Sequence, residues 1–200
     1  MKIRTAATVA LTLAAALTLA GCADGGNSSS MPGMNHDGDS SPSAEAANAN
    51  DADVMFAQMM IPHHTQAVEM SDTLLAKDGV DERVTALAEK IKAAQQPEID
   101  QLEQWLEEWG AEPAKDSMDG MDHGSGMMNE EDMQALDDAT GNDASRLFLE
   151  QMTAHHEGAI EMAQDEVNNG QNPGATQMAQ DIVDTQTAEI TEMEDILATL

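Results

Sequence analysis

The same eleven-residue pattern occurs twice in this chain of 200 residues. Residues 60–70 and 152–162 both read Met-x-x-His-His-x-x-Ala-x-Glu-Met, and a Phe stands four residues before each copy. Positions three, four and seven residues apart share one face of an α-helix. The pattern therefore predicts two equivalent helical stripes, each with one imidazole between two thioethers: Met60, His63 and Met70, and Met152, His155 and Met162.

The repeat continues into the segment that follows each copy. Residues 84–99 align with residues 175–190, and this alignment matches Gln95 with Gln186 and Glu98 with Glu189. Each half therefore predicts two helices joined by a short turn, which makes them antiparallel neighbours. We expect an all-α domain over residues 51–200, a four-helix bundle made of a duplicated αα-hairpin with halves 51–110 and 143–200.

Caps and breakers give the expected helix boundaries. The sequence predicts long helices over residues 51–77, 80–109 and 143–168, a fourth helix to residue 200, and a short acidic helix over residues 130–139. Asn50 or Asp51 is the expected N-cap of the first helix. Pro62 leaves two alternatives for this helix, because proline removes a hydrogen bond inside a helix. Either the helix bends there, or a new helix begins at Pro62.

The N-terminal segment has the features of an export signal. Lys2 and Arg4 precede an apolar run, and Leu-Ala-Gly-Cys at residues 19–22 resembles a bacterial lipobox. We expect residues 1–21 to be a lipoprotein signal peptide, Cys22 to carry the lipid, and residues 22–50 to be a flexible polar tether. Because Cys22 is the only cysteine, the sequence excludes other thiolate ligands and a disulfide.

The charge balance limits the partners of the domain. The formal net charge is -30, with 38 acidic against 8 basic residues. Such a surface repels nucleic acid and anionic lipid and attracts cations. The sequence contains 16 Met residues but only two Phe, two Trp and no Tyr. Methionine as flexible core filler accounts for part of this content.

Methionines in polar linkers need another explanation, because nothing packs against them there. Two low-complexity stretches, within the tether and within residues 111–129, contain Ser-Met-x-Gly-Met-x-His. Thioethers and imidazoles are the ligands that Cu(I), and by extension Ag(I), prefers. We therefore predict soft-metal ligands in the linkers, with accidental low complexity as the alternative: Met31, Met34, His36, Met118, Met121, His123, Met127 and Met128.

The duplicated Met-x-x-His-His-x-x-Ala-x-x-Met pattern, followed by Gln-x-x-Glu-Ile and preceded by a lipobox, resembles the bacterial "domain of unknown function 305" family. The resemblance covers residues 51–200. It implies an exported protein with a ferritin-like four-helix bundle, and some members of that family are tied to copper binding and copper tolerance. It therefore favours an envelope-anchored protein that binds copper ions and meets other copper-handling proteins of the envelope.

The residues leave two interpretations of the bundle interior. In the first, the imidazoles of His63 and His155 and the four stripe thioethers bind metal, and His64 and His156 contribute from the flank of each helix. In the second, the histidines belong to a buried hydrogen-bond network. Both interpretations predict the same supporting contacts, because polar groups also orient metal-bound histidines. These supporting residues are Gln95, Glu98, Gln186 and Glu189.

We expect a binding protein rather than an enzyme. Ferritin-like di-iron sites use Glu-x-x-His on two helices, and this motif is missing from the sequence. The sequence also contains no nucleophile elbow and no zincin motif. A tethered structural or partner-binding bundle remains as the alternative. It explains the helices and the charge but not the Met/His repeats of the linkers.

Overall fold

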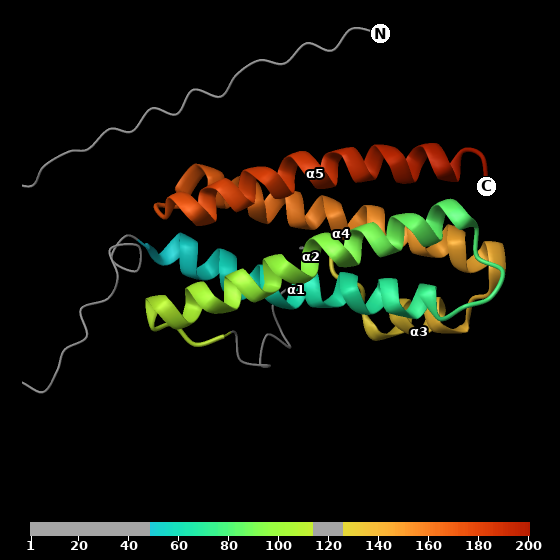
Figure 1. The fold of residues 1–200 in the computed structure, drawn as a ribbon, viewed down its shortest axis with the longest axis horizontal. Coiled ribbons are helices and arrows are strands. Elements are labelled where there is room, and N and C mark those ends of the chain that lie inside the picture. Colours follow the sequence, from blue (N-terminus) through green and yellow to red (C-terminus); the bar gives the residue numbers. More distant parts are fainter. Residues whose placement is uncertain (1–48, 114–125) are drawn as a thin grey trace, which may run out of the picture. The chain divides into compact units, whose positions relative to one another are not determined.

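The computed structural model describes residues 49–113 and 126–200, which form five helices and no strand (Figure 1). No helix in this part of the chain is long and apolar enough to span a membrane. The all-α prediction is confirmed. The helices are α1 (Asp51–Leu75), α2 (Glu82–Trp109), α3 (Glu130–Asp138), α4 (Gly141–Asn169) and α5 (Pro173–Leu197).

Polar caps start most of these helices. The side chain of Asn50 accepts hydrogen bonds from the backbone N–H groups of Ala52 and Asp53 at the start of α1. Asn129 caps α3 in the same way, and Asn172 caps α5, whose first residue is Pro173. These side chains satisfy N–H groups that have no partner inside a helix. The prediction of an N-cap at Asn50 or Asp51 is therefore confirmed at Asn50.

The boundaries differ from the prediction by a few residues. The first helix ends at Leu75, and the second begins at Glu82 because Asp81 caps it. The third long helix begins two residues earlier than expected, at Gly141, and the last ends at Leu197. At Pro62, α1 continues through the proline as one helix, so no new helix begins there. Pro97 lies inside α2 in the same manner.

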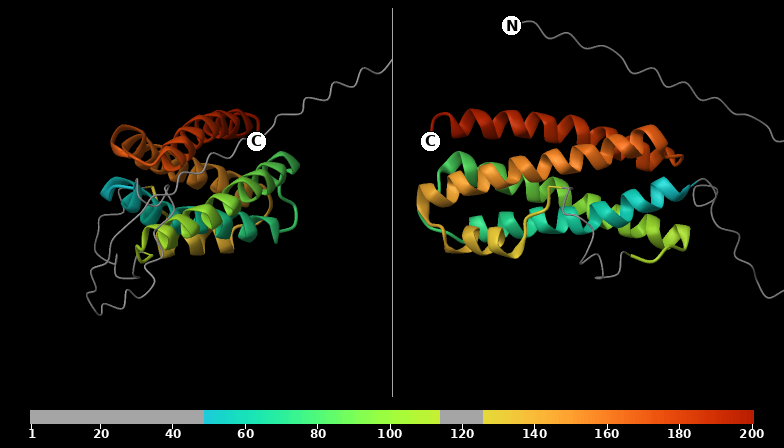
Figure 2. Two further views of the ribbon diagram at one scale, coloured as in Figure 1. Left: turned by 60° about the vertical axis from the view of Figure 1, so that its left-hand side comes forward. Right: turned by 180° about the vertical axis from the view of Figure 1, so that it is seen from behind.

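The helices form two antiparallel hairpins, α1–α2 and α4–α5, that pack on each other through α1 and α4 (Figure 2). α2 and α5 contact each other much less, and α3 lies against α1 and α4. The duplicated hairpin predicted from the repeat is thus the arrangement of the bundle. Its two first helices, which carry the two copies of the pattern, lie at the centre.

The apolar core consists of two clusters, one toward each end of the bundle. One cluster includes Phe56, Met60 and Leu102, and the other includes Ile91, Phe148 and Met152. Since α1 and α4 run in opposite directions, each cluster takes the beginning of one central helix and the end of the other. The two copies of the pattern therefore meet between the clusters.

Each hairpin stabilises the turn of the other hairpin. The Asp53 carboxylate of α1 accepts hydrogen bonds from the backbone N–H groups of Gln171 (3.0 Å) and Asn172 (2.8 Å) in the α4–α5 turn. In the other half, the Ser145 hydroxyl of α4 accepts one from the N–H of Asp81 (3.0 Å) in the α1–α2 turn. These contacts relate the two halves by the same pseudo-twofold symmetry as the sequence repeat.

A second carboxyl group lies beside Asp53. Glu166 of α4 is 2% exposed, and its carboxyl group lies so close to Gly170 that a side chain at Gly170 would overlap with it. Burial and the neighbouring carboxylate of Asp53 raise the pKa of Glu166 from 4.5 to about 8. Glu166 is therefore mainly protonated at neutral pH.

Candidate functional site

Four buried imidazoles form a row across the centre of the bundle. His63 and His64 of α1 and His155 and His156 of α4 are each no more than 1% exposed. The ring centroids of His63 and His155 are 3.7 Å apart, and each of these rings lies 6.5 Å from the ring of its neighbour in sequence. The α1–α4 contact thus brings together the paired histidines of both repeats, in the order His64, His63, His155, His156.

The outer imidazoles of the row contact carboxylates within their own hairpins. His64 Nε2 lies 2.8 Å from Glu98 Oε2 on α2, and His156 Nε2 lies 2.9 Å from Glu189 Oε2 on α5. The sequence predicted these two glutamates as supporting residues, and the structure pairs them with His64 and His156. These two histidines lie on the flank of their helices, as predicted, and the second helix of each hairpin buries that flank.

The carboxylates fix the tautomer of the outer imidazoles. A neutral imidazole that donates Nε2–H to a carboxylate has its lone pair on Nδ1. The Nδ1 atoms of His64 and His156 are buried and have no hydrogen-bond partner among the described residues. Metal-binding histidines in proteins have this arrangement, in which a carboxylate holds one nitrogen and the other nitrogen binds the ion.

Burial keeps the imidazoles of His155 and His156 neutral. Burial and then the neighbouring imidazoles of His63, His156 and His64 hold the pKa of His155 well below its ordinary value of 6.5. Burial also lowers the pKa of His156, although its contact with Glu189 acts in the opposite direction. Neutral imidazoles are the form that binds metal. The unfolded chain takes up protons at these positions as the pH falls below about 6.5, so acidification destabilises the folded state.

Thioethers lie on both sides of the row. Met60 and Met162 belong to the cluster at the α4–α5 turn, and Met70 and Met152 belong to the opposite cluster. Met162 is partly buried, and the other three are fully buried. Each side thus has one sulfur from α1 and one from α4. Within residues 49–113 and 126–200, no three His, Cys, Asp or Glu side chains can hold a metal ion by themselves. An ion in the bundle therefore needs thioether ligands beside the imidazoles.

The amides that align in the repeat lie in the same region of the bundle. Gln95 of α2 and Gln186 of α5 are each 3% exposed, and each precedes its glutamate by three residues, about one helical turn. Their Oε1 atoms have no hydrogen-bond partner within the described part of the chain. They add polar groups to the interior around the histidine row.

The end of the second Met/His-rich stretch is fixed across α1 and α4. The Gln66 side chain donates to the Met128 carbonyl (2.8 Å) and accepts from the Met128 N–H (2.7 Å). Gly126 has φ +74°, and a Cβ there would overlap with the Ala154 carbonyl, next to His155. We call residues 126–129 the strap, because they cross the α1–α4 junction beside the histidine row. The sequence analysis did not identify Gln66 or Gly126, although Gly126 stands among glycines of a predicted linker.

The structure leaves the other predicted linker ligands untested. Met127 and Met128 belong to the strap and are partly exposed. The remaining predicted residues lie outside the described residues: Cys22, Met31, Met34, His36, Met118, Met121 and His123.

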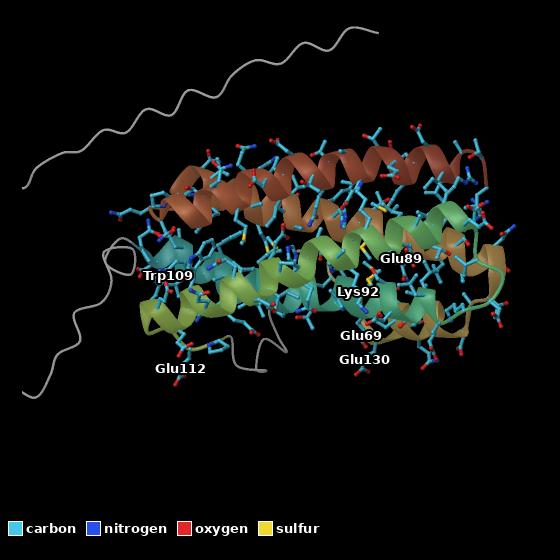
Figure 3. The ribbon with its side chains drawn as sticks, in the orientation of Figure 1. Glu69, Glu89, Lys92, Trp109, Glu112 and Glu130 are labelled. Carbon is cyan, nitrogen blue, oxygen red and sulfur yellow. The ribbon has the colours of Figure 1, made fainter. Side chains whose placement is uncertain are left out.

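The outside of the bundle is strongly acidic. Figure 3 shows the side chains of Glu69, Glu112 and Glu130 at its outer edge, and all three residues are exposed. Such a surface raises the local concentration of cations around the bundle. The histidine row is thus a nitrogen-rich interior within an anionic shell.

Comparison with known proteins identifies the family. The profile of the family "Domain of unknown function (DUF305)" matches residues 53–197. The chain belongs to the DUF305 family. No match was found among curated proteins.

Solved DUF305 structures share this fold. A DUF305 fragment from Deinococcus radiodurans is 31% identical with a TM-score of 0.70, and the match covers 76% of this chain and 99% of that fragment. A presumed secreted DUF305 protein from Streptomyces coelicolor is 34% identical with a TM-score of 0.68, over 74% of this chain and 91% of that protein. CopM in its Cu(I)-bound form is 28% identical with a TM-score of 0.63, and the match covers 74% of this chain and 96% of CopM. CopM structures with Cu(II) and with Ag are also similar to this chain.

Proposed function

We propose that this DUF305 protein is an exported, lipid-anchored copper-binding protein that holds Cu(I), and also Ag(I), without catalysing a reaction. The observation that carries the proposal is the set of buried imidazole nitrogens in the histidine row. The Nδ1 atoms of His64 and His156 have no hydrogen-bond partner in the described part of the chain, while Glu98 and Glu189 hold the opposite nitrogens. The copper- and silver-bound forms of CopM support the choice of metal.

The interior donors suit a soft monovalent cation. Thioether sulfur and neutral imidazole nitrogen bind Cu(I) well, whereas hard divalent cations prefer oxygen ligands. The four histidines supply nitrogen, and the thioethers on either side supply sulfur. Glu98 and Glu189 orient the outer imidazoles, and Gln95 and Gln186 add polar groups beside them. In this proposal the linker methionines and histidines collect ions at the surface for storage in the bundle.

A buried polar network without metal is the second candidate, and the His–Glu contacts favour it equally. Carboxylates that hold neutral imidazoles would stabilise a bundle core in the absence of any ion. The buried Nδ1 atoms of His64 and His156 count against this candidate, because a buried polar group without a hydrogen bond costs about 1–3 kcal/mol. A di-iron oxidase is disfavoured, since among residues 49–113 and 126–200 the row is contacted by two carboxylates, Glu98 and Glu189, and such sites use more.

Separate replacement of the linker and bundle ligands tests the proposal. In the linker variant, the six methionines become Leu and the two histidines become Asn: Met31, Met34, His36, Met118, Met121, His123, Met127 and Met128. We expect a lower Cu(I) capacity in an anaerobic competition titration. The melting temperature should hardly change, since surface substitutions usually alter stability by less than about 0.5 kcal/mol. Met128 packs against the core, and leucine preserves this apolar contact.

The bundle variant, with His63 and His155 replaced by Asn, should behave differently. Both residues are buried, so we expect a loss of stability of about 1–3 kcal/mol together with a loss of Cu(I) binding. Bound Cu(I) should also raise the melting temperature of the wild-type protein, because a ligand of the folded state stabilises it. Normal Cu(I) binding in both variants would contradict the proposed function.

Lipid anchoring is tested separately. If residues 19–22 are a lipobox, Cys22→Ser should prevent lipidation, because the thiol of Cys22 is the attachment point. The variant should then leave the detergent phase in a phase-partitioning experiment with whole cells. Wild-type protein treated in parallel is the control, and unchanged partitioning of the variant would rule out the anchor.

A further inference from the structure

The two ends of the histidine row differ in their access to solvent. The Glu98 side chain, which contacts His64, is 27% exposed, whereas the Glu189 side chain, which contacts His156, is 2% exposed. Both carboxylates make the same contact with an imidazole at nearly the same distance. The difference must therefore come from what surrounds each carboxylate.

Lys90 covers Glu189. Its Nζ atom lies 3.6 Å from Glu189 Oε1 and 3.1 Å from Glu192 Oε2, so α2 is linked to α5 at this end of the row. The alignment of the two repeats matches Lys90 with Asp181. The pseudo-twofold symmetry therefore places an acidic residue on the Glu98 side, where the Glu189 side has a cation.

Besides its two ends, the histidine row has a side along the α1–α4 junction, and the strap covers this side. Gln66 holds Met128 on α1, and Gly126 packs against the Ala154 carbonyl of α4. These contacts place the strap on the α1–α4 junction itself. Of the approaches to the row formed by described residues, the Glu98 side is the one where a carboxylate reaches both solvent and an imidazole.

We propose that Glu98 is the access point through which a soft cation enters and leaves the histidine row, and that Lys90 closes the Glu189 end. This inference rests on the proposed function and adds the route by which the ion enters and leaves the bundle. A partly exposed carboxylate attracts a cation from solution and lies in direct contact with His64. At the other end, the Lys90 ammonium group repels an approaching cation and occupies the carboxylate that would receive it.

Reversal of the charge at Lys90 and at Asp181, which occupy equivalent positions in the repeat, tests this access route. Lys90 is half exposed and Asp181 is exposed, so Asp181→Lys and Lys90→Asp should fold normally. We expect Asp181→Lys to slow Cu(I) loading of the metal-free protein by about tenfold, since local charge changes association rates by this order. Lys90→Asp should accelerate loading by opening a second end. Transfer of Cu(I) from the loaded protein to a chromophoric chelator should change in the same direction.

Two substitutions with the same charge change serve as controls. Asp195→Lys lies farther along α5, and Lys92→Asp lies on α2 and is also partly exposed. These controls separate a local effect from the change in net charge. We expect both to load Cu(I) at nearly the wild-type rate.

A second measurement needs no metal. In the metal-free protein, the Nε2–H proton of His64 should exchange with water faster than that of His156 in ¹⁵N NMR spectra, and Lys90→Asp should accelerate exchange at His156. Equal exchange at both histidines would overturn the proposal. If the protein binds Cu(I) at equilibrium but Asp181→Lys and Asp195→Lys load Cu(I) at the same rate, the access route is overturned and the proposed function is kept. Absence of Cu(I) binding at equilibrium would overturn the proposed function and the access route with it.

Discussion

Glu166→Gln is expected to make the protein more stable than the wild type above pH 8. The wild-type carboxyl group is buried beside Asp53, with a pKa raised to about 8 from 4.5. Each unit of pKa shift corresponds to about 1.4 kcal/mol, so ionisation of the folded protein costs on the order of 5 kcal/mol at high pH. Glutamine has nearly the same shape and stays neutral, and it therefore avoids this cost.

The direction of the pH dependence follows from the bound protons. Between pH 4.5 and about 8, the folded state holds a proton on Glu166 that the unfolded state has released. The contribution of Glu166 is therefore complete below pH 4.5 and is lost as the pH rises through about 8. Urea denaturation of both proteins from pH 6 to 9 should show a stability difference that grows with pH. Glu161→Gln, an exposed substitution on the same helix, is the control. A constant difference across this range would contradict the assignment.

Alanine at Met60 and Met152 is expected to have the second large effect. Both side chains are fully buried, one in each core cluster. Truncation of a buried methionine leaves a cavity and costs about 2–5 kcal/mol for each residue. Leucine at the same positions preserves volume and apolarity, so its cost should stay below about 1.5 kcal/mol.

The leucine substitutions separate packing from metal binding. If the thioethers bind Cu(I), Met60→Leu with Met152→Leu should lower Cu(I) affinity by at least about tenfold, because even the loss of an indirect contact to a metal ion typically costs about 10- to 100-fold. Denaturant melts and anaerobic Cu(I) titrations of the same samples provide both values. Met55→Leu, at an exposed position on α1, is the control. Unchanged Cu(I) affinity in the leucine double variant would identify these methionines as core residues only.

The sequence repeat predicted most of the fold. Helical periodicity located four long helices within a few residues of their observed ends, and the match between the halves predicted two hairpins in one bundle. The boundary at Glu82 was missed because the cap, Asp81, lies one residue beyond the Val80 predicted to start the helix. Continuity through Pro62 depends on packing of α1 along its whole length, and a local rule for proline does not contain that information.

The sequence indicated which bundle residues lie around the candidate site, but not which of them contact each other. Stripe geometry indicated that His63 and His155 face the core, and their rings lie together as expected of equivalent helices. The same geometry placed His64 at the flank of α1. In the structure α2 packs on this flank, and Glu98 contacts His64. Which carboxylate meets which imidazole depends on the rotation of each helix against its partner. Differences such as that between Glu98 and Glu189 also depend on contacts distant in sequence, such as the ion pair of Glu189 with Lys90.

The exchange of turn contacts between the hairpins also bears on the origin of the chain. Asp53 of one hairpin closes the turn of the other, and Ser145 returns the contact. Each hairpin thus supplies hydrogen-bond partners to the turn of the other, so we expect the two to fold together as a single cooperative unit. A protein with one such hairpin would obtain the missing contacts from a second copy of itself. In a single chain the two equivalent positions can carry Lys90 and Asp181, whereas a symmetric dimer carries the same residue at both.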